Sequence, residues 1–319
     1  MSDEELAALL PPIAHDANKY TRGSLLVLAG SARFTGAAVL AAQAAARTGA
    51  GYVTLAIPQP AAPVAQGHLL STAVLAAPAA GGAFAADAWM TIKAQLTKVD
   101  AIVLGPGITV TEASREFVRC VVEDARATDV ALLVDADGIN CLAALLAEGR
   151  LVGGGAGAGG AGADGAGAGA GAGECAGGDS RGGFKDDGTP RFIVTPHSGE
   201  LKRLLAGAGA LSMGQLAEML ECVVVAKGPV TQVLGAGRHV SSGTGTAALA
   251  RAGTGDVLAG VIGALLAQGM GAFDAACVGV ELHSRAGLLA QGALGLRSVC
   301  AEDVVASIAA VLKAVEGHV

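Results

Sequence analysis

The sequence predicts an α/β protein whose mostly parallel central sheet is covered by helices on both faces, a three-layer α/β/α arrangement. Apolar runs of four to six residues recur along the chain, helical segments separate them, and most runs end in a loop of small or polar residues. Such short, continuously apolar runs are typical of strands buried on both faces. The apolar fraction is 52% while aromatic residues contribute 3%, so we expect a core of Ala, Val, Leu and Ile.

The N-terminal part is expected to form a strand, a loop, a helix and a second strand. The first apolar run, at 24–29, ends at Gly30, and an Ala-rich helical segment at 37–47 stops at Gly49. Glycine directly after a helical segment is a typical C-terminal cap. The run at 52–57 supplies the next strand. This order of elements is the repeating unit of a parallel sheet.

Later apolar runs continue this pattern. They lie at 101–104, 130–134, 192–195 and 222–226. Two shorter runs, at 231–234 and 239–241, are separated by a turn and predict antiparallel strands at the sheet edge. In parallel sheets of this kind, ligands bind beyond the carboxyl ends of the strands. The loops that open there begin at Gly105, Asp135, Pro196 and Lys227.

One segment, residues 153–188, breaks the pattern because Gly and Ala alternate along most of it. Such a segment offers too little side-chain area to offset the entropy of ordering it. We expect a disordered insert at the surface of a single domain. The alternative is a flexible hinge between two domains. The insert is favoured because the apolar run that follows has the character of another strand of the same sheet.

Charge and targeting signals exclude several classes of protein. The net charge is −7 and no run of five basic residues occurs, so neither nucleic acid nor a membrane is expected as a partner. The six cysteines form no CxxC pair, which argues against a zinc site or a disulfide framework. Residues 1–10 are acidic, unlike a signal peptide, and the apolar stretches are too short to span a bilayer. We therefore expect a cytoplasmic protein.

The most specific motif is Gly-Thr-Gly-Asp at 253–256, which opens a strongly apolar helical stretch. The unpaired amides and partial positive charge of a helix start can stabilise a transferring phosphoryl group without a basic side chain. Asp256 is therefore a candidate catalytic base, with the amides of Gly253, Thr254 and Gly255 around the anion. The alternative is a simple helix cap. A helix start lowers the pKa of a carboxylate, so we expect desolvation by the substrate to counter this effect.

Three further motifs give the chain a resemblance to a known family. They are NKYTRGSLLVLAGS at 18–31, FTGAA at 34–38 and TPHSGE at 195–200. Together with Gly-Thr-Gly-Asp, and in this order, they resemble the ADP/ATP-dependent (S)-NAD(P)H-hydrate dehydratases of the ribokinase-like superfamily. The resemblance covers residues 11–315 apart from the insert at 153–188. It implies one ribokinase-like domain related to carbohydrate kinases.

The resemblance implies a cytoplasmic metabolite-repair enzyme, a hydro-lyase that converts hydrated NADH or NADPH back to the reduced dinucleotide. ADP or ATP would be the co-substrate that drives the loss of water, with Mg²⁺ as the accompanying metal. A separate epimerase would supply the (S) hydrate, because only residues 1–10 precede the region of resemblance. The resemblance also implies a homotetramer.

Roles for individual residues follow from the same resemblance. Ala37, Gly107 and His197 would contact the hydrated dinucleotide, and Asp256 would lie beside its reacting hydroxyl. Gly255 and one loop would hold the nucleotide, and this loop consists of Lys227, Gly228, Pro229, Val230 and Thr231. Each position follows an apolar run or a glycine turn, so all of them can converge on one edge of the sheet.

Several of these residues also have a simpler structural explanation. Gly107 lies in a Gly-Pro-Gly tripeptide, which is typical of a turn. His197 has the position of a hydrogen-bonding residue at a strand end, and Lys227 has that of a solvated turn residue. Asp135 and Asp137, at the end of another run, can bind Mg²⁺ through water or cap the next helix. The metal ligands therefore stay unassigned.

The chain departs from the family pattern at Thr246, where the family usually has Asn, and at Arg251 and Ala252, which replace smaller residues. A hydroxyl cannot reproduce both the donor and the acceptor of an amide, so we expect weaker contacts to the nucleotide or metal at Thr246. Ser198 replaces a common Pro, and we expect little effect.

Other functions are compatible with parts of this pattern. A ribokinase-like kinase for a vitamin-precursor alcohol would use the same Asp256 but release a stable phosphate ester. A non-catalytic dinucleotide sensor would bind NADPH without turnover. A hydride-transfer dehydrogenase is disfavoured, because Gly-Ser-Ala-Arg at 30–33 stands where the ordinary dinucleotide fingerprint would follow the first strand.

Overall fold

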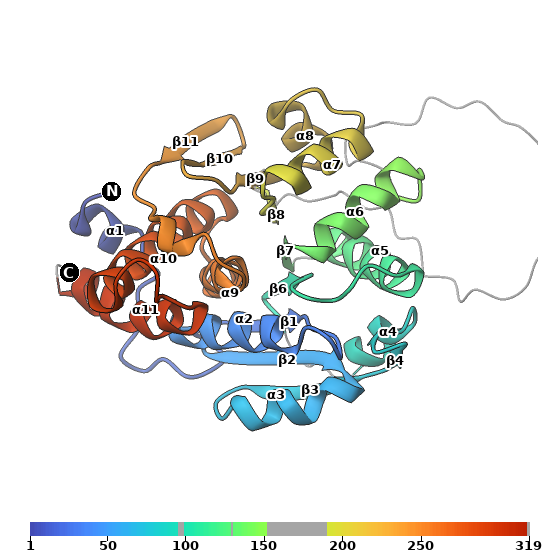
Figure 1. The fold of residues 1–319 in the computed structure, drawn as a ribbon, viewed down its shortest axis with the longest axis horizontal. Coiled ribbons are helices and arrows are strands. Elements are labelled where there is room, and N and C mark those ends of the chain that lie inside the picture. The colour runs from blue at the N-terminus through green and yellow to red at the C-terminus, as the bar shows by residue number, and fades with distance from the viewer. Residues whose placement is uncertain (95–98, 129, 152–189, 318–319) are drawn as a thin grey trace, which may run out of the picture.

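The computed structural model describes residues 1–94, 99–128, 130–151 and 190–317. The insert expected at 153–188 therefore lies outside the described residues. Within them, nine strands form one sheet in the order β11-β10-β9-β8-β7-β6-β1-β2-β3. Helices cover both faces of this sheet (Figure 1). The expected α/β class with three layers is confirmed.

Seven strands of this sheet run parallel to one another, namely β1, β2, β3, β6, β7, β8 and β9, while β10 is antiparallel to both β9 and β11. The antiparallel edge predicted from the sequence is therefore confirmed. A short hairpin, β4 (Ala79–Ala80) with β5 (Ala83–Phe84), stands apart from the large sheet. The strands of the large sheet are β1 (Ser24–Leu28), β2 (Tyr52–Pro58), β3 (Ala73–Ala77), β6 (Ala101–Leu104), β7 (Ala131–Val134), β8 (Phe192–Val194), β9 (Cys222–Ala226), β10 (Thr231–Gly235) and β11 (Arg238–Ser242).

Two groups of helices bury the two faces of the sheet in separate apolar cores. The first group consists of α1 (Asp3–Leu9), α2 (Thr35–Arg47), α3 (Ala62–His68), α9 (Thr254–Ala267), α10 (Ala272–Leu294) and α11 (Ala301–Glu316). The second group consists of α4 (Ala88–Lys93), α5 (Glu112–Ala127), α6 (Asp137–Ala147), α7 (Ser198–Ala208) and α8 (Met213–Leu220). Short 3-10 turns, η1 (Gln59–Ala61) and η2 (Ala247–Leu249), complete the elements. No helix among the described residues combines the length and the apolar character that a membrane crossing requires.

Successive residues of the central strands point into opposite cores. In β1, Leu25 and Val27 belong to the core beneath α9, whereas Leu26 and Leu28 belong to the core beneath α5. Side chains of a strand alternate between its two faces. The strand is apolar throughout because helices cover both faces.

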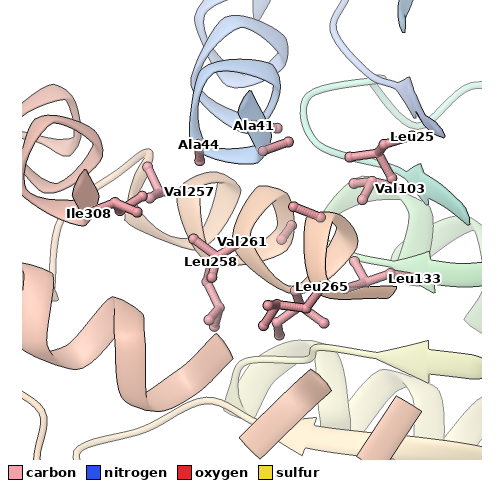
Figure 2. Packing of buried hydrophobic residues seen from close by; sticks show 14 of the residues in the cluster. Leu25, Ala41, Ala44, Val103, Leu133, Val257, Leu258, Val261, Leu265 and Ile308 are labelled. Carbon is pink, nitrogen blue, oxygen red and sulfur yellow. The ribbon is translucent and has the colours of Figure 1, made fainter. Parts of the chain in front are cut away.

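Helix α9 contacts β1, β6 and β7 at the centre of the sheet and is buried along most of its length. Figure 2 shows its apolar side chains packed near Ala41 and Ala44 of α2 on one side and Leu133 of β7 on another. The close approach of α2 depends on Gly260, where a Cβ would lie 2.2 Å from the carbonyl oxygen of Ala41. This packing fixes the start of α9, and with it the Gly-Thr-Gly-Asp motif.

Most predicted elements are confirmed with small shifts at their ends. The runs at 101–104 and 222–226 coincide with β6 and β9. Helix α2 begins at Thr35, ahead of the expected start. Helix α9 begins at Thr254, so Asp256 lies within its first turn and does not open the helix.

Candidate active site

A cavity of about 670 Å³ lies beside the start of α9, between that helix, α10 and the loops that follow β9 and β11. Its lining is mostly apolar with a few polar groups, which is typical of a small-molecule site. The lining residues are His197, Lys227, Gly228, Pro229, Thr231, Ser242, Gly245, Thr246, Ala247, Leu249, Ala250, Arg251, Ala252, Thr254, Gly255, Leu258, Val280, His283 and Ser284.

The start of α9 is held in place by its own loop. Gly253 precedes the helix with φ 94°, a conformation that favours glycine. The Thr254 hydroxyl donates to the carbonyl oxygens of Leu249 (2.7 Å) and Arg251 (2.8 Å). The first amides of a helix have no acceptor within the helix. These amides are therefore available to an anion, as the sequence predicts.

The environment of Asp256 raises the pKa of its carboxyl group to about 7. Burial is the largest cause, and the negative charge of Asp135 adds to it, while Lys227 opposes both. The expectation that the substrate must desolvate this group is therefore wrong, because the protein itself already buries it. A carboxylate with a pKa near neutral is well suited to general base catalysis.

Asp135 and Lys227 form a buried ion pair, which the sequence did not predict. The Lys227 ammonium lies 2.6 Å from Oδ1 of Asp135, and the Thr195 hydroxyl donates to the same oxygen at 2.7 Å. The Asp135 side chain is 1% exposed. Asp135 is therefore not a helix cap, since Ala136 precedes α6 and no side chain caps that helix. Lys227 is likewise not a solvated turn residue.

His197 has a structural role and also lines the cavity. It precedes α7, its Nδ1 accepts a hydrogen bond from the Gly199 amide (2.9 Å), and its own amide donates to Glu200 (2.8 Å). Its side chain is 54% exposed. The ring therefore caps the helix while one side remains open to a ligand.

Gly107 and Ala37 lie next to each other but are not among the residues that line the cavity. A Cβ on Gly107 would lie 3.0 Å from Cβ of Ala37 and 2.8 Å from Cβ of Phe34, and Gly107 has φ 66°. Glycine is thus required both by backbone conformation and by the close approach of α2. The structure therefore separates this pair from the residues around the cavity, and Gly253 and Asp256 are likewise not among its lining residues.

The residues of the predicted nucleotide loop, 227–231, differ in whether they line the cavity. Gly228, Pro229 and Thr231 line the cavity, whereas Val230 is 52% exposed and does not. The Thr231 hydroxyl, expected to face a phosphate, donates to the Gly228 carbonyl at 3.4 Å. Thr246, the position that departs from the family pattern, lines the cavity and caps η2 by accepting a hydrogen bond from the Ala248 amide.

Sequence reasoning missed His283 and Ser284 of α10, which also line the cavity. Burial lowers the pKa of His283 to about 4, so its ring is neutral at physiological pH. No sequence signal distinguishes these residues, because they lie in the middle of a largely buried helix. Among the described residues, no group of three or more His, Cys, Asp or Glu side chains is arranged to bind a metal ion.

The parallel sheet, the cavity beyond its strand ends and a carboxylate in the first turn of a glycine-opened helix define a ribokinase-like α/β protein with a candidate phosphoryl-transfer site. A family model described as NAD(P)H-hydrate dehydratase matches residues 25–150 and 184–309. The chain belongs to this family. The resemblance inferred from the sequence motifs is thereby confirmed.

Individual relatives agree with this assignment. The chain is 32% identical over 312 residues to the bifunctional NAD(P)H-hydrate repair enzyme of Salinibacter ruber, covering 95% of this chain and 51% of that protein. It is 29% identical to the enzyme of the same description from Moorella thermoacetica, covering 97% of this chain and 53% of the relative. The chain thus spans about half the length of the curated relatives it matches.

Solved structures show the same fold. The ADP/ATP-dependent NAD(P)H-hydrate dehydratase of Bacillus subtilis, co-crystallised with ATP and Mg²⁺, has a TM-score of 0.72 and 25% identity, covering 99% of this chain and 98% of that chain. A ribokinase-like superfamily protein of Enterococcus faecalis has a TM-score of 0.75, 18% identity and coverage of 99% and 95%. At that identity the second likeness concerns the fold alone.

Proposed function

We propose that this chain catalyses the nucleotide-dependent dehydration of (S)-hydrated NADH or NADPH, restoring the reduced dinucleotide at the cost of ADP or ATP hydrolysis. The observation that carries the proposal is Asp256, a half-buried carboxyl group with a pKa of about 7 in the first turn of α9. It stands next to Gly255, which lines the large cavity. Family membership supports the same reaction.

The chemistry requires a better leaving group than hydroxide. In the proposed step, Asp256 accepts the proton of the ring hydroxyl while the hydroxyl oxygen attacks the terminal phosphoryl group of the nucleotide. The bond from that phosphorus to the bridging oxygen breaks, and the shortened nucleotide leaves. The carbon–oxygen bond then breaks with loss of phosphate, assisted by the ring nitrogen lone pair, and a proton leaves the neighbouring ring carbon.

The chain would stabilise the phosphoryl group through backbone amides. The amides of Gly253, Thr254 and Gly255 lie at the start of α9 and would face the negative charge that develops in the step. The loop of residues 227–231 would hold the nucleotide, with Lys227 near its phosphates. Mg²⁺ would enter bound to the nucleotide phosphates, as is common for this ion, and would neutralise charge there. ATP and Mg²⁺ in the Bacillus subtilis relative support this assignment.

The hydrated dinucleotide would bind against Ala37, Gly107 and His197. The contact between Ala37 and Gly107, and the open side of His197, support a substrate surface at the strand ends. We further propose that residues 11–315, apart from the insert at 153–188, form one domain. We also propose that the protein is a cytoplasmic homotetramer and that a separate epimerase for the hydrate acts in the same pathway. The description of the curated relatives as bifunctional repair enzymes supports a second repair activity in that pathway.

The test is recovery of the absorbance of reduced nicotinamide from purified NADPH hydrate with ADP, with ATP or without nucleotide. We expect recovery only with a nucleotide, and a loss of at least about 10²-fold in Asp256→Asn, the usual scale for a general base. Asp87→Asn, an exposed acid at the start of α4, is the matched control and should retain full activity. Release of a stable phosphate ester would instead identify a kinase.

A further inference from the structure

Three neighbouring strands bring a charged cluster together beneath the start of α9. Strands β7, β8 and β9 are adjacent and parallel, and they are followed by Asp135, Thr195 and Lys227 respectively. The pair of Asp135 and Lys227 therefore bridges across the end of β8, where the Thr195 hydroxyl donates to Asp135. Both polar contacts are made to the same oxygen, Oδ1.

The cluster lies directly against the first turn of α9. A Cβ built on Gly255 would lie 3.4 Å from the Lys227 ammonium and 3.9 Å from Oδ2 of Asp135. A Cβ at this position would thus be in van der Waals contact with the ammonium. Lys227 thus lies beside both the carboxylate that pairs with it and the first turn of α9, whose amides are expected to bind the transferring phosphoryl group.

We propose that Asp135 is a positioning residue for the site: it holds the Lys227 ammonium against the first turn of α9 and keeps a second negative charge beside Asp256. The proposal deepens the function proposed above and rests on it. Without Asp135, Lys227 would be free to pair with Asp256, and an ion-paired carboxylate is a weaker base.

Four charged side chains near Asp256 determine in which direction the loss of Asp135 changes the pKa of Asp256. Apart from burial, the carboxylates of Asp135, Asp137 and Glu200 raise the pKa of Asp256, while Lys227 lowers it. Asp135 is the largest of these charge effects. Replacing it with Asn removes a negative charge and leaves the positive charge of Lys227 in place. The pKa of Asp256 should therefore fall.

The experiment is a ¹³C NMR titration of the aspartate carboxyl groups in the full chain, with the Asp256 resonance assigned from Asp256→Asn. We expect Asp135→Asn to lower the pKa of Asp256 by about one unit or more, the scale of a nearby like charge. Thr195→Val is the control, because it removes the hydroxyl contact without changing any charge, and it should leave the pKa of Asp256 within a few tenths. A pKa of Asp256 in Asp135→Asn that equals the wild-type value would overturn the proposal.

A second variant guards against loss of folding in Asp135→Asn, which circular dichroism would reveal. Asp137→Asn removes a carboxylate at the start of α6 that affects the pKa of Asp256 less than Asp135 does. This variant should therefore lower the pKa of Asp256 by a smaller amount. An unchanged pKa in every folded variant would count against the proposal.

The pH profile of dehydration separates this proposal from the proposed function. If the chain is a dehydratase, the acidic limb of the profile should move to lower pH in Asp135→Asn by the same amount as the NMR pKa. A shift seen by NMR in a protein that does not dehydrate the hydrate would leave the positioning role of Asp135 intact and reject the reaction.

Discussion

At the scale of single residues, Asp256 shows how environment outweighs local position. A carboxyl group in the first turn of a helix is stabilised in its charged form by the helix dipole. Burial of the carboxyl group, together with the charge of Asp135, has the opposite effect and dominates, since the pKa rises to about 7. The carboxyl group is therefore partly protonated near neutral pH, and the free energy of unfolding should depend on pH in this range.

Because the pKa of Asp256 rises from 3.8 to about 7 on folding, the contribution of this group is fully present below about pH 4 and is lost as the pH rises through about 7. The loss is on the order of 4 kcal/mol, since the pKa rises by about three units and each unit corresponds to about 1.4 kcal/mol. Asp256→Asn cannot ionise. We expect the free energy of unfolding of this variant to increase relative to wild type across that range, as measured by urea denaturation at several pH values.

The control for this measurement is again Asp87→Asn, whose side chain is exposed. The free energy of unfolding of this control should differ from that of wild type by the same amount at every pH. Parallel stability curves for Asp256→Asn and wild type would show that Asp256 is not shifted, and would remove the main support for its role as a base.

At the scale of elements, the packing of α9 depends on glycines at its closest contacts. Gly260 faces the backbone of α2 at Ala41, and a Cβ on Gly263 would lie 2.3 Å from Cγ2 of Val103 in β6. Both contacts hold the helix close to the centre of the sheet (Figure 2). Since the first turn of α9 carries Asp256, a displacement of the helix would also move the site.

We expect Gly260→Ala to destabilise the protein by about 1 to 3 kcal/mol, the usual cost of an extra methyl group in a filled core. Gly292→Ala is the matched control, because Gly292 lies in helix α10 with no atom within 4 Å of its added Cβ. Alanine favours helix over glycine, so this control should be neutral or more stable by up to about 1 kcal/mol. Thermal unfolding of both variants is the measurement, and equal effects would contradict the proposed packing.

At the scale of the whole molecule, the two ends of the chain share one core. Helix α1 contacts α10 and α11, and Arg285 of α10 pairs with Asp3 and donates to the Met1 carbonyl (2.6 Å). Helix α2 packs against α9 and α11, and both termini lie on the same side of the molecule (Figure 1). Because the same sheet supports both apolar cores, neither core is complete on its own.

This arrangement predicts that the chain unfolds as one cooperative unit, in agreement with the single domain proposed above. Trp89, the one tryptophan of the sequence, is 4% exposed in the core beneath α5, so its fluorescence reports on that side of the sheet. Far-UV circular dichroism reports on all helices. We expect the two signals to give coincident urea transitions. Separate transitions would support the alternative of two domains joined by a hinge.

The sequence could predict elements whose pattern is local. Apolar runs such as 101–104 became β6, because a strand buried on both faces must be apolar throughout. The start of α9 was also predictable, since glycines before an apolar helical stretch are a local signal. Strand β3 (Ala73–Ala77) was missed, because it is an Ala-rich edge strand and mostly only half-buried, with no distinctive pattern.

The sequence by itself thus determined the α/β class, the motifs and the family, because these depend on residue type and order along the chain. Only the tertiary structure decided that Asp135 and Lys227, 92 positions apart, form an ion pair across β8. It also decided that Ala37 and Gly107 lie outside the cavity lining and that His283 lies within it. Contacts of this kind depend on strand order and helix packing. Burial depends on them as well, and burial raises the pKa of Asp256, so this pKa cannot be inferred from the residue type alone.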